Sequence, residues 1–340
     1  MKLFLFISII YYIIQSILAI HNPSIRLKKN ELTLTKIEIP QEFAKKQLSG
    51  LAWYRDSLLF VLPERLLEPG GCSCIFAIRK DVLTTAFSTQ KISSYQKISI
   101  QVLPNVDLSL AQGFEALCFV NDTVFLTLER DDHTAFLLKG IFYASENKIQ
   151  LIKSVVIEHK LNKVLRNATM EGVLFFNQKL YCFHESNGIA NNNSTANASV
   201  YNTKLEFVEY MPMDALEYRL TDVSAVANKK FYALNYYYFE KEFKNYRPDN
   251  DLLLNKISQN DSHFRYIENN SYLKKVERIV EFKITENRIV LNKEKVYYLK
   301  LDQISRNIEG IEILTYQNKN YFIISTDAFP DDGLYFTKMN

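Results

Sequence analysis

Glycine is scarce in this chain, and several patterns that mark common enzyme classes do not occur in it. Only nine of the 340 residues are glycine, and no glycine-rich phosphate loop is present, which excludes the usual nucleotide-binding loops. The Gly-X-Ser-X-Gly elbow and the His-Glu-X-X-His helix are also missing, so neither an α/β hydrolase nor a zinc protease is indicated. The 41 basic residues barely exceed the 38 acidic ones and form no long run, which excludes a nucleic-acid footprint.

Long apolar runs are confined to the N-terminus. Lys2 precedes an apolar stretch over residues 3–14 that only Ser8 interrupts, and Ala19 offers a small residue for cleavage, so residues 1–19 are typical of a signal peptide. An uncleaved anchor is the alternative, but the stretch is short for a span of about 20 residues. No second segment could cross a membrane. We therefore predict a secreted protein, extracellular or in the secretory-pathway lumen, with no membrane span after cleavage.

Asn-X-Ser/Thr sequons agree with export and predict a glycoprotein, although an Asn-rich composition produces some of them by chance. They begin at Asn121, Asn167, Asn192, Asn193, Asn197, Asn260 and Asn269.

Cysteine is also scarce, with only Cys72, Cys74, Cys118 and Cys182. Four cysteines permit two disulfides in an oxidising compartment. No matching histidine spacing accompanies them, which argues against a zinc site.

One pattern that the sequence does contain is repeated five times. Each copy opens with a small or acidic residue and a small residue, and continues into a short apolar strand, a polar turn and a second strand. The copies span residues 48–64, 114–129, 170–185, 223–235 and 308–327. Turn sequences such as Arg55-Asp56 and Asn121-Asp122 suit tight β-hairpins.

Further strand-like runs follow each hairpin and predict an all-β propeller with four strands per blade. Only one strand-like run, residues 333–338, follows the fifth hairpin, so the last blade lacks its outer strand. Residues 32–39, near the N-terminus, can supply that strand and close the ring. The count predicts five blades, with six as the alternative if a degenerate blade is hidden. A β-sandwich would not explain a missing last strand matched by an extra first one. Residues 20–340 are predicted to form a single propeller domain with an inserted loop at about 240–273.

The opening and closing residues of the hairpins are predicted to meet at one mouth of the central channel, because the first strand starts beside the end of the second. The opening positions are Ser49, Glu115, Glu171, Asp222 with Ser224, and Glu309; the closing positions are Glu64, Glu129, Glu185, Asn235 and Asp327. Eight carboxylates together require raised pKa values or a cation, and oxygen donors suit Ca²⁺ better than zinc. The predicted metal ligands are Glu64, Glu115, Glu129, Glu171, Glu185, Asp222, Glu309 and Asp327. Alternatively, the carboxylates accept backbone N–H groups of neighbouring blades.

Basic residues adjoin three of the closing carboxylates. Arg65, Arg130 and His184 are next to Glu64, Glu129 and Glu185 in the chain. We predict Arg65 and Arg130 as ligand-binding groups and His184 as a candidate acid–base group, with a surface or turn histidine as the simpler interpretation. The loops at 187–198 and 240–273 are expected at the same mouth, where they could shape a ligand site or shield it with glycans.

The hairpins resemble the phytase-like family of secreted propellers, the group described by an esterase-like activity of phytase. The similar segments are residues 49–52 (Ser-Gly-Leu-Ala), 113–117 with 128–130 (Leu-Glu-Arg), 170–172 (Met-Glu-Gly) with 184–186, 221–223 (Thr-Asp-Val), and 308–311 (Ile-Glu-Gly-Ile) with 325–327. The resemblance implies a Ca²⁺-binding acidic mouth and phosphoester hydrolysis. Propeller phytases also hold phosphate with a basic cluster, for which this chain offers Arg65, Arg130, His184 and Arg306. The chain departs from the acidic pattern at Ser49 and Asn235, which stand where acids are expected.

Two functions are therefore predicted. The first is a Ca²⁺-dependent phosphoesterase that acts on a small phosphorylated molecule, in which the metal polarises phosphate and a carboxylate activates water. Its candidate catalytic residues are Glu115, Glu171, Glu185, Glu309 and His184, with Glu129 and Asp327 as further carboxylates. The second is a non-catalytic secreted propeller whose rim loops bind an extracellular ligand or protein. Neither involves a nucleic acid.

Overall fold

Short β-strands dominate the part of the chain that the computed structural model describes. That part is residues 31–339 without 45, 66–72, 131–133, 158–167, 189–195, 239–245, 303–304 and 328–330. It belongs to the compact unit Glu31–Asn340. The predicted signal peptide lies outside the described residues, as do Cys72, Asn167, Asn192, Asn193 and the start of the predicted insertion.

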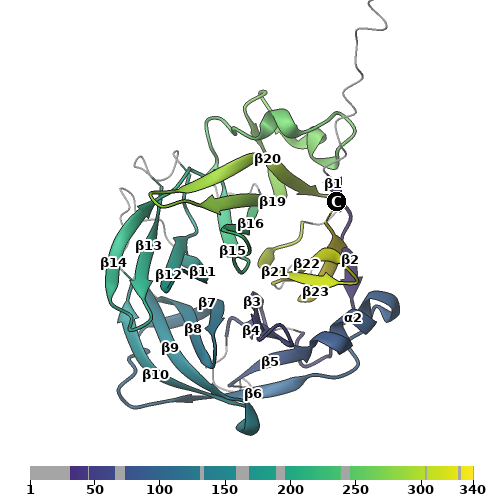
Figure 1. Cartoon of the computed structure of the whole chain (residues 1–340). Coiled ribbons are helices and arrows are strands. Elements are labelled where there is room, and N and C mark those ends of the chain that lie inside the picture. The colour runs from purple at the N-terminus through teal and green to yellow at the C-terminus, as the bar shows by residue number, and fades with distance from the viewer. Residues whose placement is uncertain are drawn as a thin grey trace, which may run out of the picture. The chain divides into compact units, whose positions relative to one another are not determined.

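The strands form antiparallel quartets, called here the first to the fifth quartet, and the outer strands of the first two quartets also pair with each other in the parallel sense. The first holds β3 (Leu48–Tyr54), β4 (Leu58–Pro63), β5 (Cys74–Arg79) and β6 (Gln96–Val102), and the second holds β7 (Ala111–Val120), β8 (Thr123–Arg130), β9 (Ala135–Tyr143) and β10 (Lys148–Val156). The third holds β11 (Met170–Phe176), β12 (Lys179–His184), β13 (Asn197–Asn202) and β14 (Phe207–Pro212). The fourth holds β15 (Arg219–Val223), β16 (Lys230–Tyr238), β19 (Lys275–Ile284) and β20 (Ile289–Leu299), and the fifth holds β21 (Ile308–Tyr316), β22 (Lys319–Thr326), β23 (Gly333–Lys338) and β2 (Thr35–Ile37). Figure 1 shows them around one centre with β3, β7, β11, β15 and β21 innermost, which is a β-propeller.

Tight turns close the inner hairpins as the sequence predicts. Both central residues have positive φ in the turns at Arg55-Asp56, Asn177-Gln178, Asn228-Lys229 and Gln317-Asn318, the backbone that a two-residue type I′ hairpin requires. The fourth hairpin is a partial miss. Its first strand begins at Arg219 and not at Val223, because the paired segment opens with residues 219–222, of which only Leu220 is apolar, and so gives no apolar run to recognise.

Hydrophobic clusters fill the interfaces between adjacent quartets. Phe60 of the first quartet and Phe142 of the second meet edge to face, with ring centroids 5.1 Å apart. Phe183 of the third and Phe231 of the fourth lie 5.2 Å apart. Because each sheet is covered on both faces, inner strands such as β4 are buried at every residue, and their sequences are continuous apolar runs.

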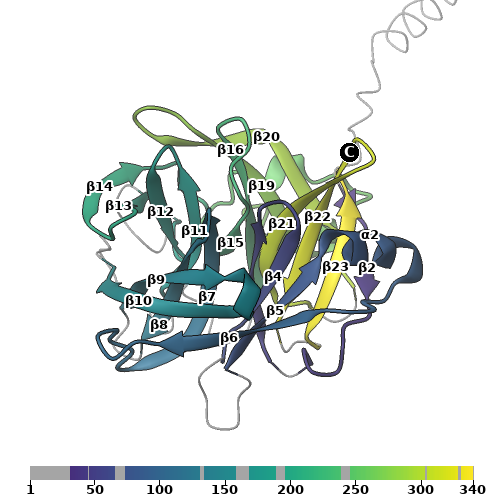
Figure 2. The ribbon, with the colours of Figure 1, turned by 60° about the horizontal axis from the view of Figure 1, so that its bottom comes forward.

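The N-terminal segment closes the fifth quartet. Its strand β2 pairs antiparallel with β23, with Ile37 opposite Leu334, which confirms the predicted use of residues 32–39. The segment also supplies β1 (Glu31–Leu32), which pairs with β20 in the parallel sense. Helix α2 (Lys80–Thr89) was not predicted; it lies on the outside beside β23 and β2 in Figure 2, where Phe87 stacks on Phe336 at 4.2 Å.

The insertion between β16 and β19 contains the 3₁₀ helices η3 (Leu254–Lys256) and η4 (Ser262–Tyr266) and the strand pair β17 (Ile267–Glu268) and β18 (Tyr272–Leu273). It is anchored by the buried ion pair of Asp251 with Arg278 on β19, at 2.8 Å. Its described part is therefore an ordered addition to the fourth quartet.

The cysteines do not form the two disulfides that four cysteines permit. Cys74 is disulfide-bonded, whereas Cys118 and Cys182 are free thiols. In the described residues, no helix is long and apolar enough to span a membrane.

Candidate active site at the acidic mouth of the channel

A β-bulge recurs at the start of the first strand of every inner hairpin. The pairing register slips by one residue at Glu171, Thr221 and Glu309, and within the pairs Ser49-Gly50 and Glu115-Ala116. A bulge leaves one residue unpaired and re-aims its side chain. The same local distortion therefore presents the opening residue of each hairpin at one end of the channel, which explains why an acidic residue recurs there.

Asp222 does not share this position, contrary to the sequence prediction. The bulge of the fourth quartet falls on Thr221, so Asp222 matches the small residues that follow each bulge, such as Gly172 and Gly310. Its Oδ2 accepts the Ile311 N–H at 2.8 Å, and burial raises its pKa well above the usual range in spite of its backbone hydrogen bonds. Asp222 therefore caps a neighbouring inner strand, which is the alternative that the sequence left open for these carboxylates.

Hydroxyl groups occupy the two bulge positions that lack a glutamate, and they make the same contact. Ser49 Oγ donates to the Phe114 carbonyl at 2.7 Å, and Thr221 Oγ1 donates to the Ile308 carbonyl at 2.7 Å. Phe114 and Ile308 directly precede Glu115 and Glu309. Each hydroxyl thus fixes the backbone that presents the glutamate of the next quartet.

The acidic mouth, as we define it, consists of the seven remaining predicted carboxylates: Glu64, Glu115, Glu129, Glu171, Glu185, Glu309 and Asp327. Burial, and then repulsion from neighbouring carboxylates, raises the pKa of Glu115 and of Glu171 well above the usual range. The same causes raise the pKa of Glu129 to about 7 and that of Asp327 to about 7. Apart from Asp332, which repels Asp327, the carboxylates that repel these four residues are other members of the mouth, so the structure brings the seven residues into one electrostatic site.

Gly113 leaves a space between two of these carboxylates. A Cβ atom at Gly113 would lie 2.9 Å from Glu64 Oε1 and 2.8 Å from Glu115 Oε1. Both distances are shorter than real Cβ contacts, so any larger residue here would require the two glutamate side chains to shift. The oxygens of Glu64 and Glu115 therefore flank a common gap.

Arg219 supplies a positive charge inside the mouth that the sequence analysis missed. Its Nε donates to Glu185 Oε1, and its Nη2 lies 3.6 Å from Glu309 Oε1. Burial raises the pKa of Glu309 to about 8, although the attraction of Arg219 lowers it. The sequence predicts that the fourth hairpin begins at Val223, which leaves Arg219 outside the repeat. Its position two residues before the bulge at Thr221 is the signal that could have identified it.

Tyr246 reaches the mouth from the insertion. Its hydroxyl donates to Glu185 Oε2 at 2.5 Å, and burial raises its pKa well above the usual range. The sequence predicted that this insertion borders the mouth but did not single out Tyr246.

Asn235, the one closing position without an acid, donates from Nδ2 to the Glu217 and Arg219 carbonyls at 2.8 and 2.9 Å, so it holds the strand that carries Arg219.

The predicted basic and histidine residues lie in different surroundings. Arg65 Nη2 lies 3.8 Å from Glu64 Oε1 and is half-exposed, so this side chain belongs to the edge of the mouth. The Arg130 guanidinium stacks over Phe136 at 4.4 Å. His184 is buried, and its Nδ1 accepts the Ser186 N–H at 3.0 Å. Arg306 is buried against Glu277, with Nη2 to Oε2 at 2.7 Å.

The donor set of the mouth fits a hard cation such as Ca²⁺. All seven groups are carboxylates, the oxygen ligands that Ca²⁺ prefers. Asp327 Oδ1 is buried and accepts no hydrogen bond from the described residues, and Gly113 leaves the gap between Glu64 and Glu115. As the side chains stand, no three carboxylate, imidazole or thiol groups of the described chain already form a metal cluster. Binding therefore requires the glutamates to turn toward the gap.

The propeller and this mouth define the class of protein: an all-β propeller with a buried acidic site at one end of its channel. No protein-family model matches the chain, and no curated protein matches it.

Solved structures similar to the chain carry varied descriptions. One is the catalytic domain of Coprinopsis cinerea GH62 α-L-arabinofuranosidase, with 7% identity, a TM-score of 0.48, and 91% of this chain and 96% of that chain covered. Another is CoXyl43, a GH43 β-xylosidase/α-arabinofuranosidase from a compost microbial metagenome, in complex with xylotriose and in a calcium-free form, with 6% identity, a TM-score of 0.45 and coverage of 90% and 95%. A glucose dehydrogenase has 8% identity, a TM-score of 0.44 and coverage of 90% and 99%. This similarity transfers no activity, and the resemblance to the phytase-like family stays a prediction.

Proposed function

We propose that the protein is a secreted, five-bladed propeller that hydrolyses phosphoesters of small molecules with Ca²⁺ bound at the acidic mouth. The five quartets correspond to the blades, and β2 closes the ring. The observation that carries the proposal is the convergence of seven carboxylates, five of them buried, on one site that also holds the guanidinium of Arg219. Such an excess of buried acid is costly without a cation.

Four of the carboxylates would hold the cation. Glu64, Glu115, Glu129 and Asp327 come from the first, second and fifth quartets, whereas Arg219 pairs with Glu185 and Glu309. The mouth is thus polarised, with carboxylates around the Gly113 gap on one side and the guanidinium on the other. A bound Ca²⁺ would supply charge neutralisation and polarisation of a phosphoryl group.

The opposite side of the mouth suits the substrate. Arg219 presents a planar fork of donors that matches phosphate oxygens, and a phosphate can replace its longer 3.6 Å contact with Glu309. Arg65 at the edge adds a second guanidinium. Glu185, held by Arg219 and Tyr246, keeps Arg219 oriented, and Glu171 is the carboxylate that we assign to take a proton from the attacking water.

Calcium titration and phosphate release test this proposal directly. We expect CaCl₂ to raise the Tm of the purified secreted chain, EGTA to reverse the shift, and phosphate to be released from inositol hexakisphosphate or p-nitrophenyl phosphate only with Ca²⁺. The double variant Glu64→Gln/Glu115→Gln should lose both effects. Glu294→Gln, on an exposed side chain paired with Lys256, is the matched control. Unchanged Tm and no turnover would rule out the proposal.

A non-catalytic binding protein is the second candidate, and Tyr246 favours it. This residue brings the insertion into contact with Glu185 inside the mouth, so the insertion can shape a site for an extracellular ligand. In that case Ca²⁺ should raise the Tm while no phosphoester is turned over. Deletion of residues 240–273 should then abolish ligand binding and leave the propeller folded.

A further inference from the structure

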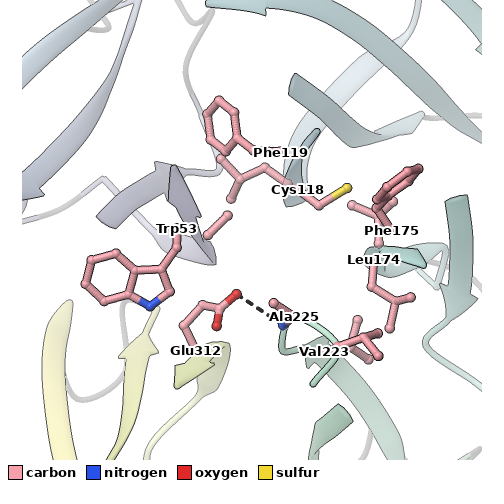
Figure 3. Close-up of a pocket in the computed structure, with 12 residues that line it drawn as sticks. Trp53, Cys118, Phe119, Leu174, Phe175, Val223, Ala225 and Glu312 are labelled. Carbon is pink, nitrogen blue, oxygen red and sulfur yellow. Dashed lines mark hydrogen bonds between the residues drawn. The ribbon is translucent and has the colours of Figure 1, made fainter. Parts of the chain in front are cut away.

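A second cavity lies farther along the inner strands, toward their hairpin turns. It has a volume of about 120 Å³ and is lined by residues that include Ala52, Cys118, Leu174, Val223 and Glu312, which Figure 3 shows around one opening. Most of these residues lie two to four positions after the bulges, which corresponds to about 10 Å along a strand. The cavity is therefore distinct from the acidic mouth.

A tightly packed layer separates the two sites. A Cβ atom at Gly50 would lie 2.9 Å from Ala116 Cα, and one at Gly310 would lie 2.1 Å from the Ser49 carbonyl oxygen, so neighbouring inner strands touch here. Asp222 lies in the same layer and accepts the Ile311 N–H. A ligand in the cavity would consequently enter from the side of the hairpin turns, where Cys118 and Phe119 are partly exposed.

Glu312 places one carboxyl group in this otherwise apolar cavity. The residue is 3% exposed, and Figure 3 shows its carboxyl group directed into the opening. Its Oε1 accepts the Ala225 N–H at 3.1 Å and its Oε2 accepts the Ile313 N–H at 2.9 Å. Both amides hold the group in one orientation, which favours the carboxylate form.

A positive partner for this carboxylate is absent from the described part of the chain. No lysine, arginine or histidine there lies within 4.0 Å of Glu312, and burial raises its pKa to about 8, with no cation acting against that shift. The free protein therefore keeps this oriented carboxyl group largely protonated at neutral pH, and a cation bound beside it would stabilise the carboxylate form.

We propose that this cavity binds a compact apolar molecule that carries one protonated amine. The ammonium group pairs with Glu312, and the apolar body packs against Leu174, Val223 and Ala52. At about 120 Å³ the cavity is somewhat smaller than the apolar cavity of about 150 Å³ that admits a benzene ring, so the ligand must be small and extend toward the side of the hairpin turns. A carboxylate ligand would face repulsion from Glu312, and a neutral ligand would leave the counter-ion position empty.

The single tryptophan of the chain gives a direct readout. Trp53 lines the cavity, and its Nε1 donates to the carbonyl of Ile313, the neighbour of Glu312, at 2.8 Å. We expect benzylamine to change the Trp53 fluorescence and to bind at least about tenfold more tightly than benzyl alcohol, which has nearly the same shape without the charge. The comparison uses the unmodified full chain.

Two variants separate charge from shape. Glu312→Gln should bring the benzylamine affinity down to that of benzyl alcohol, whereas Cys118→Leu should fill the cavity and weaken both ligands. Glu64→Gln, at the other end of the channel, should leave benzylamine binding unchanged. Equal affinities of the unmodified chain for the two ligands, or no fluorescence change with either, would overturn the proposal, and neither outcome depends on Ca²⁺ or on hydrolysis.

Discussion

Tyr246 and Glu185, 61 residues apart in the chain, are joined by a 2.5 Å hydrogen bond from the phenol to Oε2. The other oxygen of Glu185 accepts Arg219 Nε. Both oxygens of this carboxylate, which is 1% exposed, are therefore occupied by donors from the fourth quartet and its insertion. The hydrogen bond from Tyr246 therefore attaches the insertion to the same carboxylate that binds Arg219.

The variant Tyr246→Phe measures how much this contact contributes. Removal of the phenol oxygen leaves Glu185 Oε2 buried without this donor, so we expect the free energy of unfolding to fall by about 1–3 kcal/mol. Urea unfolding followed by circular dichroism gives the value. Tyr238→Phe, at a residue that is 38% exposed, should change it little. Equal stabilities of the two variants would show that the contact with Glu185 is not formed in solution.

Arg219→Met tests the role of the interior guanidinium. Methionine keeps an unbranched apolar stem but leaves Glu185 and Glu309 without their cation, so we expect a loss of about 3–5 kcal/mol. Since a Ca²⁺ ion held by the other carboxylates of the mouth would also offset the negative charge that the lost guanidinium leaves, its effect on the Tm should be larger in this variant than in the unmodified protein. Arg288→Met, which removes an exposed pair with Asp214, is the control. A variant as stable as that control would contradict the proposed electrostatics.

Much of the fold could be predicted because the repeat carries local signals. Turn pairs such as Asn177-Gln178 demand positive φ, and each apolar run is bounded by them, so hairpin positions follow from the chain alone. Helix α2 could not be predicted from residues 80–89 alone, because its apolar face is completed by Phe336, which is far away in the sequence.

The site was predictable only where the repeat is regular. Glu115, Glu171 and Glu309 follow the pattern, and the structure places all three at bulges. Thr221 and Asp222 break it, because a bulge shifts the register by one residue and the sequence does not show which of two adjacent polar residues is unpaired. Arg219 and Tyr246 reach the mouth through tertiary contacts that no local spacing records.

The pH dependence of stability should carry the signature of the raised carboxyl pKa values. Glu309 has a pKa of about 8 in the folded chain against an ordinary value of 4.5. A raised pKa stabilises the fold below the unfolded value, and that stabilisation is lost as the pH rises through the folded one. In EGTA, the unmodified protein should therefore lose stability relative to Glu309→Gln between pH 4.5 and 8, by up to about 1.4 kcal/mol per pH unit.

Urea unfolding of both proteins at several pH values checks this difference, which cancels the titration of groups common to both. Asp327→Asn should give the same sign over a window that ends at about pH 7, where Asp327 titrates in the folded chain. A difference that grows in the opposite direction would mean that these carboxylates stay ionised in the fold.

Gly310→Ala should disrupt the contact between the fifth and first quartets. The new Cβ would lie 2.1 Å from the Ser49 carbonyl oxygen and 2.2 Å from Ser325 Oγ, and the carbonyl cannot move without separating two inner strands. We expect a loss of about 3 kcal/mol or more, since overpacking against rigid atoms is at the costly end of core substitutions. Gly172→Ala is the matched control, because its nearest contact is Val223 Cγ2 at 3.1 Å, a side chain that can shift, so it should cost much less. Equal unfolding midpoints in urea for the two alanine variants would show that the inner strands do not pack this closely.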